Sequence, residues 1–416
     1  MAGMLKRIPI GSIQTLEGRP LLIASLSRPA RRNALTVQRQ VLLLLRYTTQ
    51  IQTDSPCYWG CSLIRGQRQY FPSMDGLRGF AAIAVMVAHI DIMSKLRSGV
   101  PPFFQGHMAV DVFFVLSGFV MSHSYLGKPL DWAEFAKARF ARIYPLHIAS
   151  ALGLLCLAWT GQLIFSIEVP QHFRDPQEAV EEILLLSALP GFEGQVWNSP
   201  SWSISIEWWI YFSLFPVIAL LNRRSSILPI AIGLFCMYGA FGILIDMTSG
   251  EKFTRGWFAV GRGILGFSLG WSIWRIWRDT PWMLSGAFID LCGLAILLAW
   301  FAVPQFSTSD GWFALPLIAI VIFGFSREVG LFSRVLSLRP FVWLGDISYS
   351  IYLTHMLVLL PLKYALSAFN LDDNFIAWLM FGTGGTLFLS TISYYYLEKP
   401  ARKSIRSYQW RKMKLA

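Results

Sequence analysis

The stretch DGLRGFAAIAVMVAHI, residues 75–90, decides the fold. Its apolar run continues to about residue 94, which gives the length that a helix needs to cross a hydrocarbon layer of about 30 Å. Arg78 and His89 are eleven positions apart, a rotation of three turns plus about 20° in a helix, so both side chains lie on one face. Ionisable groups inside a membrane helix are costly and usually face a polar cavity. The stretch therefore predicts a transmembrane helix with one polar face.

The rest of the chain repeats this apolar pattern. Of its 416 residues, 54% are hydrophobic and 14% charged, and the mean hydropathy is +0.48. A soluble core stops growing beyond about 250–300 residues, so this composition indicates an integral membrane protein. The expected fold is all-α and polytopic, with about ten transmembrane helices. The candidate spans are approximately 78–94, 109–126, 142–164, 205–221, 227–246, 257–275, 283–303, 312–326, 342–365 and 375–397.

Basic residues fix the orientation of these spans. The loops and ends on one side carry about 18 Lys and Arg, and those on the other side about five, which predicts that both termini are cytoplasmic. The same asymmetry accounts for the net charge of +12 without a nucleic-acid partner. The apolar run 183–189 is a possible eleventh crossing. Because counting it would reverse every later loop, we interpret Glu182 to Pro190 as an interfacial or re-entrant segment.

The chain divides into three parts by composition. Residues 1–71 form a basic N-terminal extension without a span, expected to be disordered, to carry a basic amphipathic helix near residues 28–46, or to be foreign to the native protein. We hypothesise that Met74 is the natural start. A membrane domain follows at residues 72–400, and a basic cytoplasmic tail ends the chain at residues 401–416.

Besides Arg78, four candidate site residues lie in or beside the first three spans. His89 is suited to remove a proton from a hydroxyl near neutral pH. Asp111, in GHMAVDVFFVLSGFVMS, is placed to orient His89 as a general base requires, or is simply an acid favoured at a helix N-terminus. Arg139 and Arg142, in FAKARFARIYP, are three apart and share a helix face on the cytoplasmic side. They would meet phosphates there, or anchor the loop by the positive-inside rule.

The fourth span adds a second group of polar residues. In NSPSWSISIEWWIYF, Glu207 is the candidate for catalysis, and Trp202, Ser203 and Ser205 are candidates for binding an acceptor hydroxyl, although the serines are also suited to cap the helix. For Arg262 and for His355, helix–helix hydrogen bonding is as plausible as catalysis. No metal is expected, because the Cys57 and Cys61 pair lacks the further ligands of a zinc site.

Several motifs occur together in a fixed order, namely DGLRG followed by His89, VDVFFVLSGF, RFARIYP, PSWSISIE, GDISYSIYLTH and YYYLEKPARK. Over about residues 72–403 this order resembles the membrane acyltransferase-3 family, which includes bacterial O-antigen, exopolysaccharide and Nod-factor O-acetyltransferases. The resemblance implies a ten-helix bundle that uses cytoplasmic acyl-CoA, usually acetyl-CoA, as donor substrate, with no permanently bound cofactor. It implies that Arg78 and His89 are the family's arginine–histidine pair.

Other motif positions carry over in the same way. The family's arginine pair maps onto Arg139 and Arg142, and its serine–glutamate segment maps onto Ser203, Ser205 and Glu207. The chain departs from the family pattern at Ala138, where many relatives have a basic residue. It also has Trp208 and Trp209 where an acid or Gln often follows the glutamate, which puts the acceptor contacts in doubt.

The sequence therefore predicts a multi-pass protein of the bacterial inner membrane that transfers an acyl group, by resemblance acetyl, from acyl-CoA to a carbohydrate or lipid-linked sugar. Arg78, Arg139 and Arg142 would hold the CoA phosphates. Direct transfer and an acyl-histidine intermediate both stay open. A transporter or flippase with a proton-relay histidine is the alternative, although the two halves show no convincing repeat. A non-catalytic scaffold would not explain why His89 and Arg78 share a face.

Overall fold

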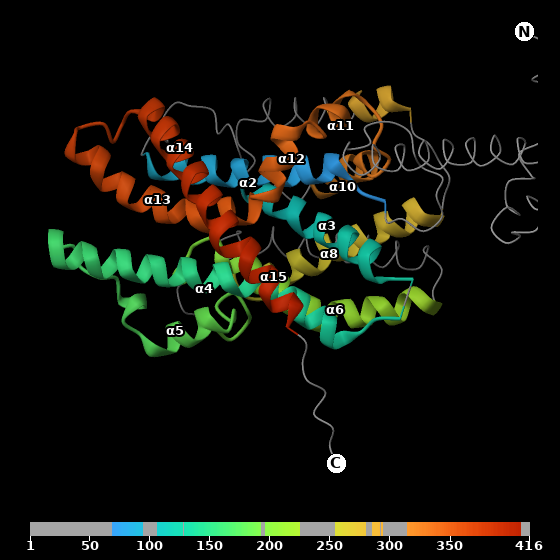
Figure 1. Ribbon diagram of the computed structural model, residues 1–416, viewed down its shortest axis with the longest axis horizontal. Helices are drawn as coiled ribbons and strands as arrows, with labels where there is room; N and C mark the ends of the chain where they lie inside the picture. The colour runs from blue at the N-terminus through green and yellow to red at the C-terminus, as the bar shows by residue number, and fades with distance from the viewer. Residues whose placement is uncertain are drawn as a thin grey trace, which may run out of the picture. The chain divides into compact units, whose positions relative to one another are not determined.

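A computed structural model describes residues 69–94, 106–127, 129–192, 196–224, 254–279, 285–291, 293 and 314–408. The chain divides into two units, Met1–Tyr70 and Phe71–Ala416, and only the second is described below. Every regular element in the described ranges is helical, which confirms the expected all-α class (Figure 1). The helices are α2 Pro72–Met93, α3 Gly106–Tyr125, α4 Trp132–Phe165, η2 Gln171–Phe173, α5 Pro176–Ile183, α6 Ser201–Arg224, α8 Gly256–Asp279, α10 Ala314–Phe325, α11 Leu331–Leu336, α12 Arg339–Asp346, α13 Ser348–Ala368, α14 Phe375–Ser393, the π-helix η4 Tyr394–Glu398, and α15 Lys399–Ser407.

Six of these helices are long and apolar enough to cross a membrane. They are α2, α3 from Met108, α4, α6 to Arg223, α13, and α14 continued through η4 and α15. Helices dominate because hydrocarbon offers backbone N–H and C=O groups no water, so each segment must satisfy its own. Two of the ten expected spans, 227–246 and most of 283–303, lie outside the described residues. The count of ten and the cytoplasmic termini therefore stay predictions.

Local sequence sets the limits of α4, the longest of the helices in the described ranges. The Asp131 side chain accepts hydrogen bonds from the backbone N–H groups of Ala133 and Glu134, at 3.0 and 3.2 Å, which caps the first turn. The helix runs for 34 residues and ends where Ser166 adopts a left-handed conformation with φ of 54°. At about 1.5 Å per residue it is about 50 Å long, so it extends beyond the hydrocarbon layer.

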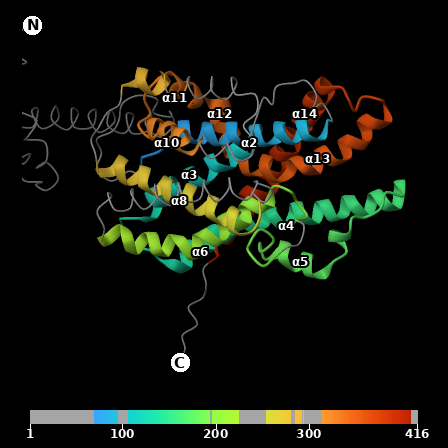
Figure 2. The same cartoon turned by 180° about the vertical axis from the view of Figure 1, so that it is seen from behind.

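Glycines allow α3 and α8 to pack with their backbones in contact (Figure 2). A Cβ atom on Gly118 would lie 2.0 Å from the carbonyl oxygen of Phe267, and one on Gly270 would lie 2.0 Å from that of Val115. Small residues at such crossings are typical of membrane helices, where packing replaces the hydrophobic drive. The close α3–α8 contact fixes the position of the polar side chains on the inner face of α3.

Helix α2 packs against α3, α12 and α13, so its polar face is turned into the bundle. Gly79 meets α12 closely, because a Cβ there would lie 2.7 Å from the backbone nitrogen of Gly345. Since α2 is unbroken from Pro72 to Met93, the expected one-face placement of Arg78 and His89 holds along a regular helix. This packing brings the arginine–histidine helix beside the helices that carry the other candidates.

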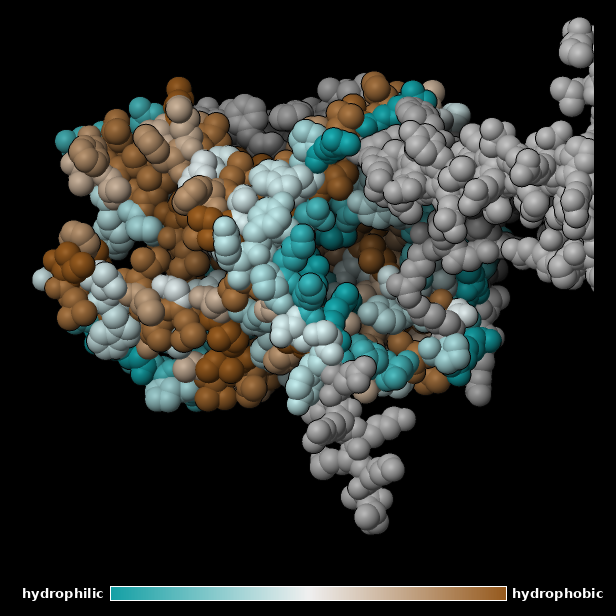
Figure 3. All heavy atoms as spheres, viewed as in Figure 1, coloured by the Kyte–Doolittle hydropathy of each residue, from teal (hydrophilic) through white to brown (hydrophobic). Residues whose placement is uncertain are grey.

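Large apolar side chains remain exposed on the outside of the bundle. Leu163 on α4 is 83% exposed, and Phe388 on α14 is 70% exposed. Figure 3 shows hydrophobic side chains over the ends of α4, α13 and α14, and more hydrophilic ones where α15 lies. An apolar surface of this extent on transmembrane helices is what contact with lipid requires. Together with the six candidate spans, this apolar surface identifies Phe71–Ala416 as the unit of a multi-pass membrane protein.

The connection between α4 and α6 turns back into the bundle. Helix α5 has only eight residues, Pro176–Ile183, and is followed by turns in which Leu185 adopts a positive φ of 56°. Leu185 and Ala188 are nevertheless fully buried. Eight helical residues span about 12 Å, far short of a membrane crossing. The run 183–189 is therefore not a membrane-spanning helix, as the interpretation of this stretch as an interfacial or re-entrant segment expected.

Candidate functional site

One pocket lies between α2, α3, α4, α6 and α13 and contains about 870 Å³ of empty space, part of it open to solvent. It brings together five of the predicted site residues from three helices: Arg78 of α2, Arg139 and Arg142 of α4, and Ser203 and Glu207 of α6. The remaining walls are mostly apolar or aromatic. They are formed by Val110, Phe113, Phe114, Leu116, Ser117, Val120, Met121, Ile143, Ile204, Tyr211, Ser348, Tyr349 and Tyr352. A concave, largely apolar site with a few convergent charges is the usual form of a ligand pocket.

The three pocket arginines keep different partners. Arg78 donates to the Asp75 carboxylate at 2.9 Å. Arg139 donates to the Tyr125 hydroxyl at 3.4 Å and lies over the Tyr125 and Tyr211 rings. Stacked guanidinium groups are held rigid and keep donor positions for an anion. The α2–α4 side of the pocket therefore presents three guanidinium groups, of which Arg78 is paired with a carboxylate and Arg139 with a phenol hydroxyl.

Arg142 belongs to a buried ion cluster at the pocket edge. It donates to Glu398 in the π-helix η4, and Arg402 donates to the same carboxylate oxygen. Ser350 donates to the second oxygen at 2.8 Å. Glu398 is only 1% exposed, so this carboxylate depends on its partners for solvation. A π-turn at this point aims Glu398 at the arginines, in line with the frequent use of π-bulges at functional sites.

Glu207 is hydrogen-bonded by two hydroxyl groups inside the pocket. Ser117 on α3 donates to Glu207 Oε1 at 2.6 Å, and Tyr211, one turn further along α6, donates to the same oxygen. The Ser117 and Tyr211 hydroxyl oxygens are 2.8 Å apart. The predicted catalytic glutamate thus sits among groups that can give and take protons.

His89 lies outside the pocket lining, next to a second histidine. Its Nδ1 lies 2.9 Å from the Val85 carbonyl oxygen, and because a carbonyl can only accept, Nδ1 carries the hydrogen. The neutral ring therefore presents a lone pair at Nε2, the arrangement of a proton acceptor. The ring centre of His355 is 4.8 Å away.

His355 connects His89 to the pocket wall. Its ring is 6.4 Å, centre to centre, from the ring of Tyr352, whose hydroxyl lies 2.6 Å from Ser203 Oγ. Its Nδ1 likewise donates to a backbone carbonyl one turn earlier, that of Ile351 at 3.1 Å. Three polar rings thus lead from His89 on α2 to the pocket.

Asp111 is bonded to Arg262 on α8. Both carboxylate oxygens accept from the guanidinium at 2.9 Å, and both side chains are nearly inaccessible, at 8% and 2% exposure. Arg262 also lies over the ring of Trp202, with its central carbon 5.3 Å from the ring centre. The structure therefore groups Asp111 and Trp202 around Arg262, with the Asp111 carboxylate turned to α8 rather than to His89.

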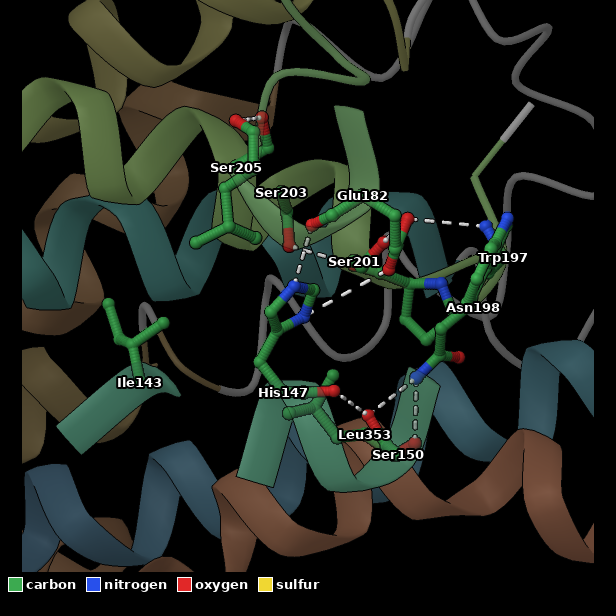
Figure 4. Close-up of polar contacts among 12 residues, drawn as sticks. Ile143, His147, Ser150, Glu182, Trp197, Asn198, Ser201, Ser203, Ser205 and Leu353 are labelled. Carbon is green, nitrogen blue, oxygen red and sulfur yellow. Dashed lines mark hydrogen bonds and ion pairs between the residues drawn. The ribbon is translucent and has the colours of Figure 1, made fainter. Parts of the chain in front are cut away.

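A second polar cluster joins the re-entrant segment to the bundle (Figure 4). His147 on α4 donates from Nε2 to the Glu182 backbone oxygen at 2.8 Å, and its Nδ1 lies 4.0 Å from Glu182 Oε1. The Glu182 carboxylate also accepts from the Trp197 backbone N–H at 3.2 Å. Asn198 donates to the Leu353 carbonyl at 2.9 Å. This cluster fixes the segment between α4, α6 and α13.

Ser205 faces this segment and not the pocket. Its hydroxyl donates to the Leu185 carbonyl, which also accepts from the Trp209 indole N–H at 2.9 Å. Ser203, two residues earlier on α6, points to the pocket instead. Helix α6 therefore turns Ser203 to the pocket and Ser205 to the segment between α5 and α6. The Ser205 hydroxyl supports the backbone at Leu185, where φ is positive.

Burial raises the pKa of the Glu182 carboxyl to about 7. Hydrogen bonds from Ser201 and from the backbone at Trp197 and Asn198 favour the charged form but do not outweigh desolvation. The unfolded chain would lose this proton near pH 4.5, so the folded segment is favoured below that pH and loses the advantage as pH rises through 7.

The free energy of opening residues 176–190 is therefore expected to fall by at most about 3 kcal/mol as the pH rises from 5 to 8. Amide hydrogen exchange at matched intrinsic rates would measure it. Glu182→Gln should remove the pH dependence, whereas Glu181→Gln, at the neighbouring buried carboxyl, should keep it. The same pH dependence in Glu182→Gln would assign the effect to another group.

The sequence did not single out Ser117, Tyr211, Tyr352 or Glu398. The sequence could have pointed to Tyr211, because Tyr211 follows Glu207 by four residues and must share its helix face. The sequence could also have pointed to Glu398, because it is an acidic residue between the last apolar run and a basic tail. Nothing in the sequence pointed to Ser117 beyond its being one small polar residue in an apolar helix.

Comparison with known proteins identifies relatives of this chain. A family model described as an acyltransferase domain matches residues 71–395. The chain is 28% identical over 367 residues to the O-acetyltransferase OatA of Staphylococcus aureus, covering 80% of this chain and 58% of that protein. It is 29% identical over 320 residues to the acyltransferase MdmB of Streptomyces mycarofaciens, covering 69% and 79%. The peptidoglycan O-acetyltransferase OatA of Listeria monocytogenes is 22% identical over 373 residues, covering 82% and 57%.

The chain therefore spans little more than half the length of the two OatA proteins. No solved structure matches it significantly. The family model, in contrast, covers most of the chain, including every predicted site residue. The chain belongs to the acyltransferase-3 family, and its described helices are those of a multi-pass membrane protein.

Proposed function

We propose that the protein transfers an acetyl group from cytoplasmic acetyl-CoA to a hydroxyl of a carbohydrate or lipid-linked sugar, in the inner membrane of a bacterium. The observation that carries the proposal is that Arg78, Arg139, Arg142 and Glu207 line one pocket. Guanidinium groups suit the phosphates of CoA. The relatives named O-acetyltransferase, all bacterial, support an acetyl group and an oxygen acceptor.

The positions of the charges suggest how the two substrates are arranged. Arg78 is near the start of α2 and His89 is eleven residues further along it, a rise of about 16 Å. The donor phosphates would bind at the arginine end, and the acceptor would approach from the His89 end. His89 Nε2 would take the proton of the acceptor hydroxyl. Holding both substrates in one geometry can contribute about 7–11 kcal/mol, so no metal is needed for a thioester donor.

Arg78→Gln is expected to raise the KM for acetyl-CoA about 10- to 100-fold, because the variant loses charge-assisted hydrogen bonds to phosphate. The assay is transfer of radiolabelled acetyl from acetyl-CoA into the glycan and lipid-sugar fractions of membranes. Arg406→Gln, at an exposed arginine of α15, is the matched control and should leave KM unchanged.

Wild-type membranes must label these fractions above membranes that lack the protein. No labelling by the wild type would contradict acetyl-CoA as the donor. Movement of an unmodified glycan across the membrane under the same conditions would favour the transporter alternative. An unchanged KM in Arg78→Gln would keep the reaction but move the phosphate site elsewhere.

A further inference from the structure

Two hydrogen-bonded side chains close the side of the pocket that is nearest to the histidines. The Tyr352 hydroxyl on α13 and Ser203 Oγ on α6 lie 2.6 Å apart, and both residues line the pocket. They are only 5% and 7% exposed. The Tyr352–Ser203 pair therefore joins α6 to α13 and forms part of the pocket wall.

The base of the proposed reaction lies behind this wall. Neither His89 nor His355 lines the pocket. The centre of the buried His355 ring is 6.4 Å from that of the Tyr352 ring and 4.8 Å from that of the His89 ring. His89 is half-buried, so its exposed part faces away from the pocket. A thioester in the pocket and a hydroxyl at His89 are therefore kept apart.

Acyl transfer requires this wall to open. The attacking oxygen must come within about 3–3.5 Å of the thioester carbonyl carbon. At the same time it must lie within hydrogen-bond reach of the base, at about 2.6–3.2 Å. Because the rings of Tyr352 and His355 lie between the pocket and His89, the two distances are not met together until the Tyr352 side chain moves.

One hydrogen bond holds the Tyr352 side chain in the closed position. Within the described part of the chain, its hydroxyl group bonds to Ser203 alone. Ser203 Oγ has a second partner, the Pro200 carbonyl oxygen at 3.4 Å. Ser203 therefore keeps a partner when the pair separates, whereas the Tyr352 hydroxyl must find a new one. The ring itself packs edge-on against Phe113, with 5.5 Å between ring centres.

A closed wall is useful because water competes with the acceptor for the thioester. A base that removes a proton from a sugar hydroxyl can remove one from water in the same way. Exclusion of water from a site prevents hydrolysis of a reactive group. The binding energy of the correct substrate can then drive the change that assembles the catalytic site.

We propose that Tyr352 and Ser203 make the enzyme select a hydroxyl acceptor over water, because their hydrogen bond keeps the thioester apart from His89 until an acceptor is bound. The proposal rests on the proposed function and deepens it. The hydroxyl groups of a bound acceptor offer the Tyr352 hydroxyl a replacement partner, so opening then leaves no buried donor unsatisfied. Further contacts of the acceptor supply binding energy that a water molecule lacks.

Hydrolysis is the side reaction expected when the pair is broken in the absence of an acceptor. Water gives a proton to His89 as its oxygen attacks the thioester carbonyl carbon. The C–S bond breaks, and the CoA thiolate takes the proton from His89. The products are acetic acid and CoA, so each turnover releases one free thiol.

The test is the rate of thiol release from acetyl-CoA by purified full-length protein without an acceptor, measured beside acetyl transfer in membranes. Tyr352→Phe keeps the ring and removes the hydroxyl, so it should raise hydrolysis about 2- to 10-fold, the effect of one lost hydrogen bond. Ser203→Ala should raise it similarly, and it serves as the second variant if Tyr352→Phe folds poorly. Tyr352→Phe combined with His89→Gln should lose the increase, because the side reaction uses the same base.

Ser390→Ala is the matched control. Ser390 Oγ lies 2.9 Å from Thr354 Oγ1, so this variant also breaks a buried hydroxyl pair of α13, here with α14 and outside the pocket lining. It should leave the ratio of hydrolysis to transfer unchanged, whereas the Tyr352 and Ser203 variants should raise it. A purely structural role of the Tyr352–Ser203 pair would not separate these variants.

The outcomes distinguish the two proposals. Unchanged hydrolysis in Tyr352→Phe and Ser203→Ala, with acetyl transfer intact, overturns the selection against water and leaves the proposed function standing. An increase that Ser390→Ala matches, or that persists without His89, does the same. A wild type that transfers no acetyl group overturns the proposed function and this inference with it.

Discussion

His89→Gln is expected to lower acyl transfer by about 10²- to 10⁴-fold, the usual contribution of a positioned general base. Glutamine can still donate to the Val85 carbonyl that holds His89 Nδ1, so the local packing of α2 should survive. What it lacks is the Nε2 lone pair that would accept the acceptor's proton. Initial rates of acetyl transfer at matched protein levels measure the effect.

His172→Gln is the matched control for this prediction, because His172 lies in η2, outside the transmembrane helices and the pocket. It should change transfer by less than about twofold. If His89→Gln stayed within a few-fold of the wild type, His89 would not be the base. The family assignment would stand, and Glu207 would become the remaining candidate for the base.

Asp111→Ala is expected to cost about 3–5 kcal/mol of folding free energy, because it leaves Arg262 as a buried, unpaired charge. Unfolding of the purified protein in detergent by a chemical denaturant would measure this loss. Replacing both partners, Asp111→Leu with Arg262→Met, should recover most of the stability, since it removes the uncompensated charge and keeps the side-chain volume.

The double variant also decides what Asp111 does. If the carboxylate only neutralises Arg262, the double variant should recover transfer together with stability. A stable double variant with transfer reduced as far as in His89→Gln would return Asp111 to the role of orienting His89. A stable Asp111→Ala single variant would show that the ion pair with Arg262 contributes little to the fold.

Periodicity within one helix made several site features predictable. Arg78 and His89 lie on an unbroken α2 as their spacing requires, and Arg139 and Arg142, three residues apart on α4, both reach the pocket. Glu207 was found in the same way, as an acid inside an apolar run. These inferences succeeded because a membrane helix must satisfy its own backbone, which fixes the direction of each side chain from local sequence alone.

The sequence by itself therefore determined a helical membrane bundle, its family, and the helices that carry charge. Only the tertiary structure decided which charges meet. Ser117 bonds to Glu207, which is 90 residues away in the sequence. Asp111 bonds to Arg262 at a separation of 151 residues, and Arg142 bonds to Glu398 at a separation of 256. Such pairs depend on which helix faces pack together, and glycine crossings such as that of Gly118 set those faces. One helix's periodicity shows where a side chain points, but its partner lies on another helix whose position no local pattern encodes.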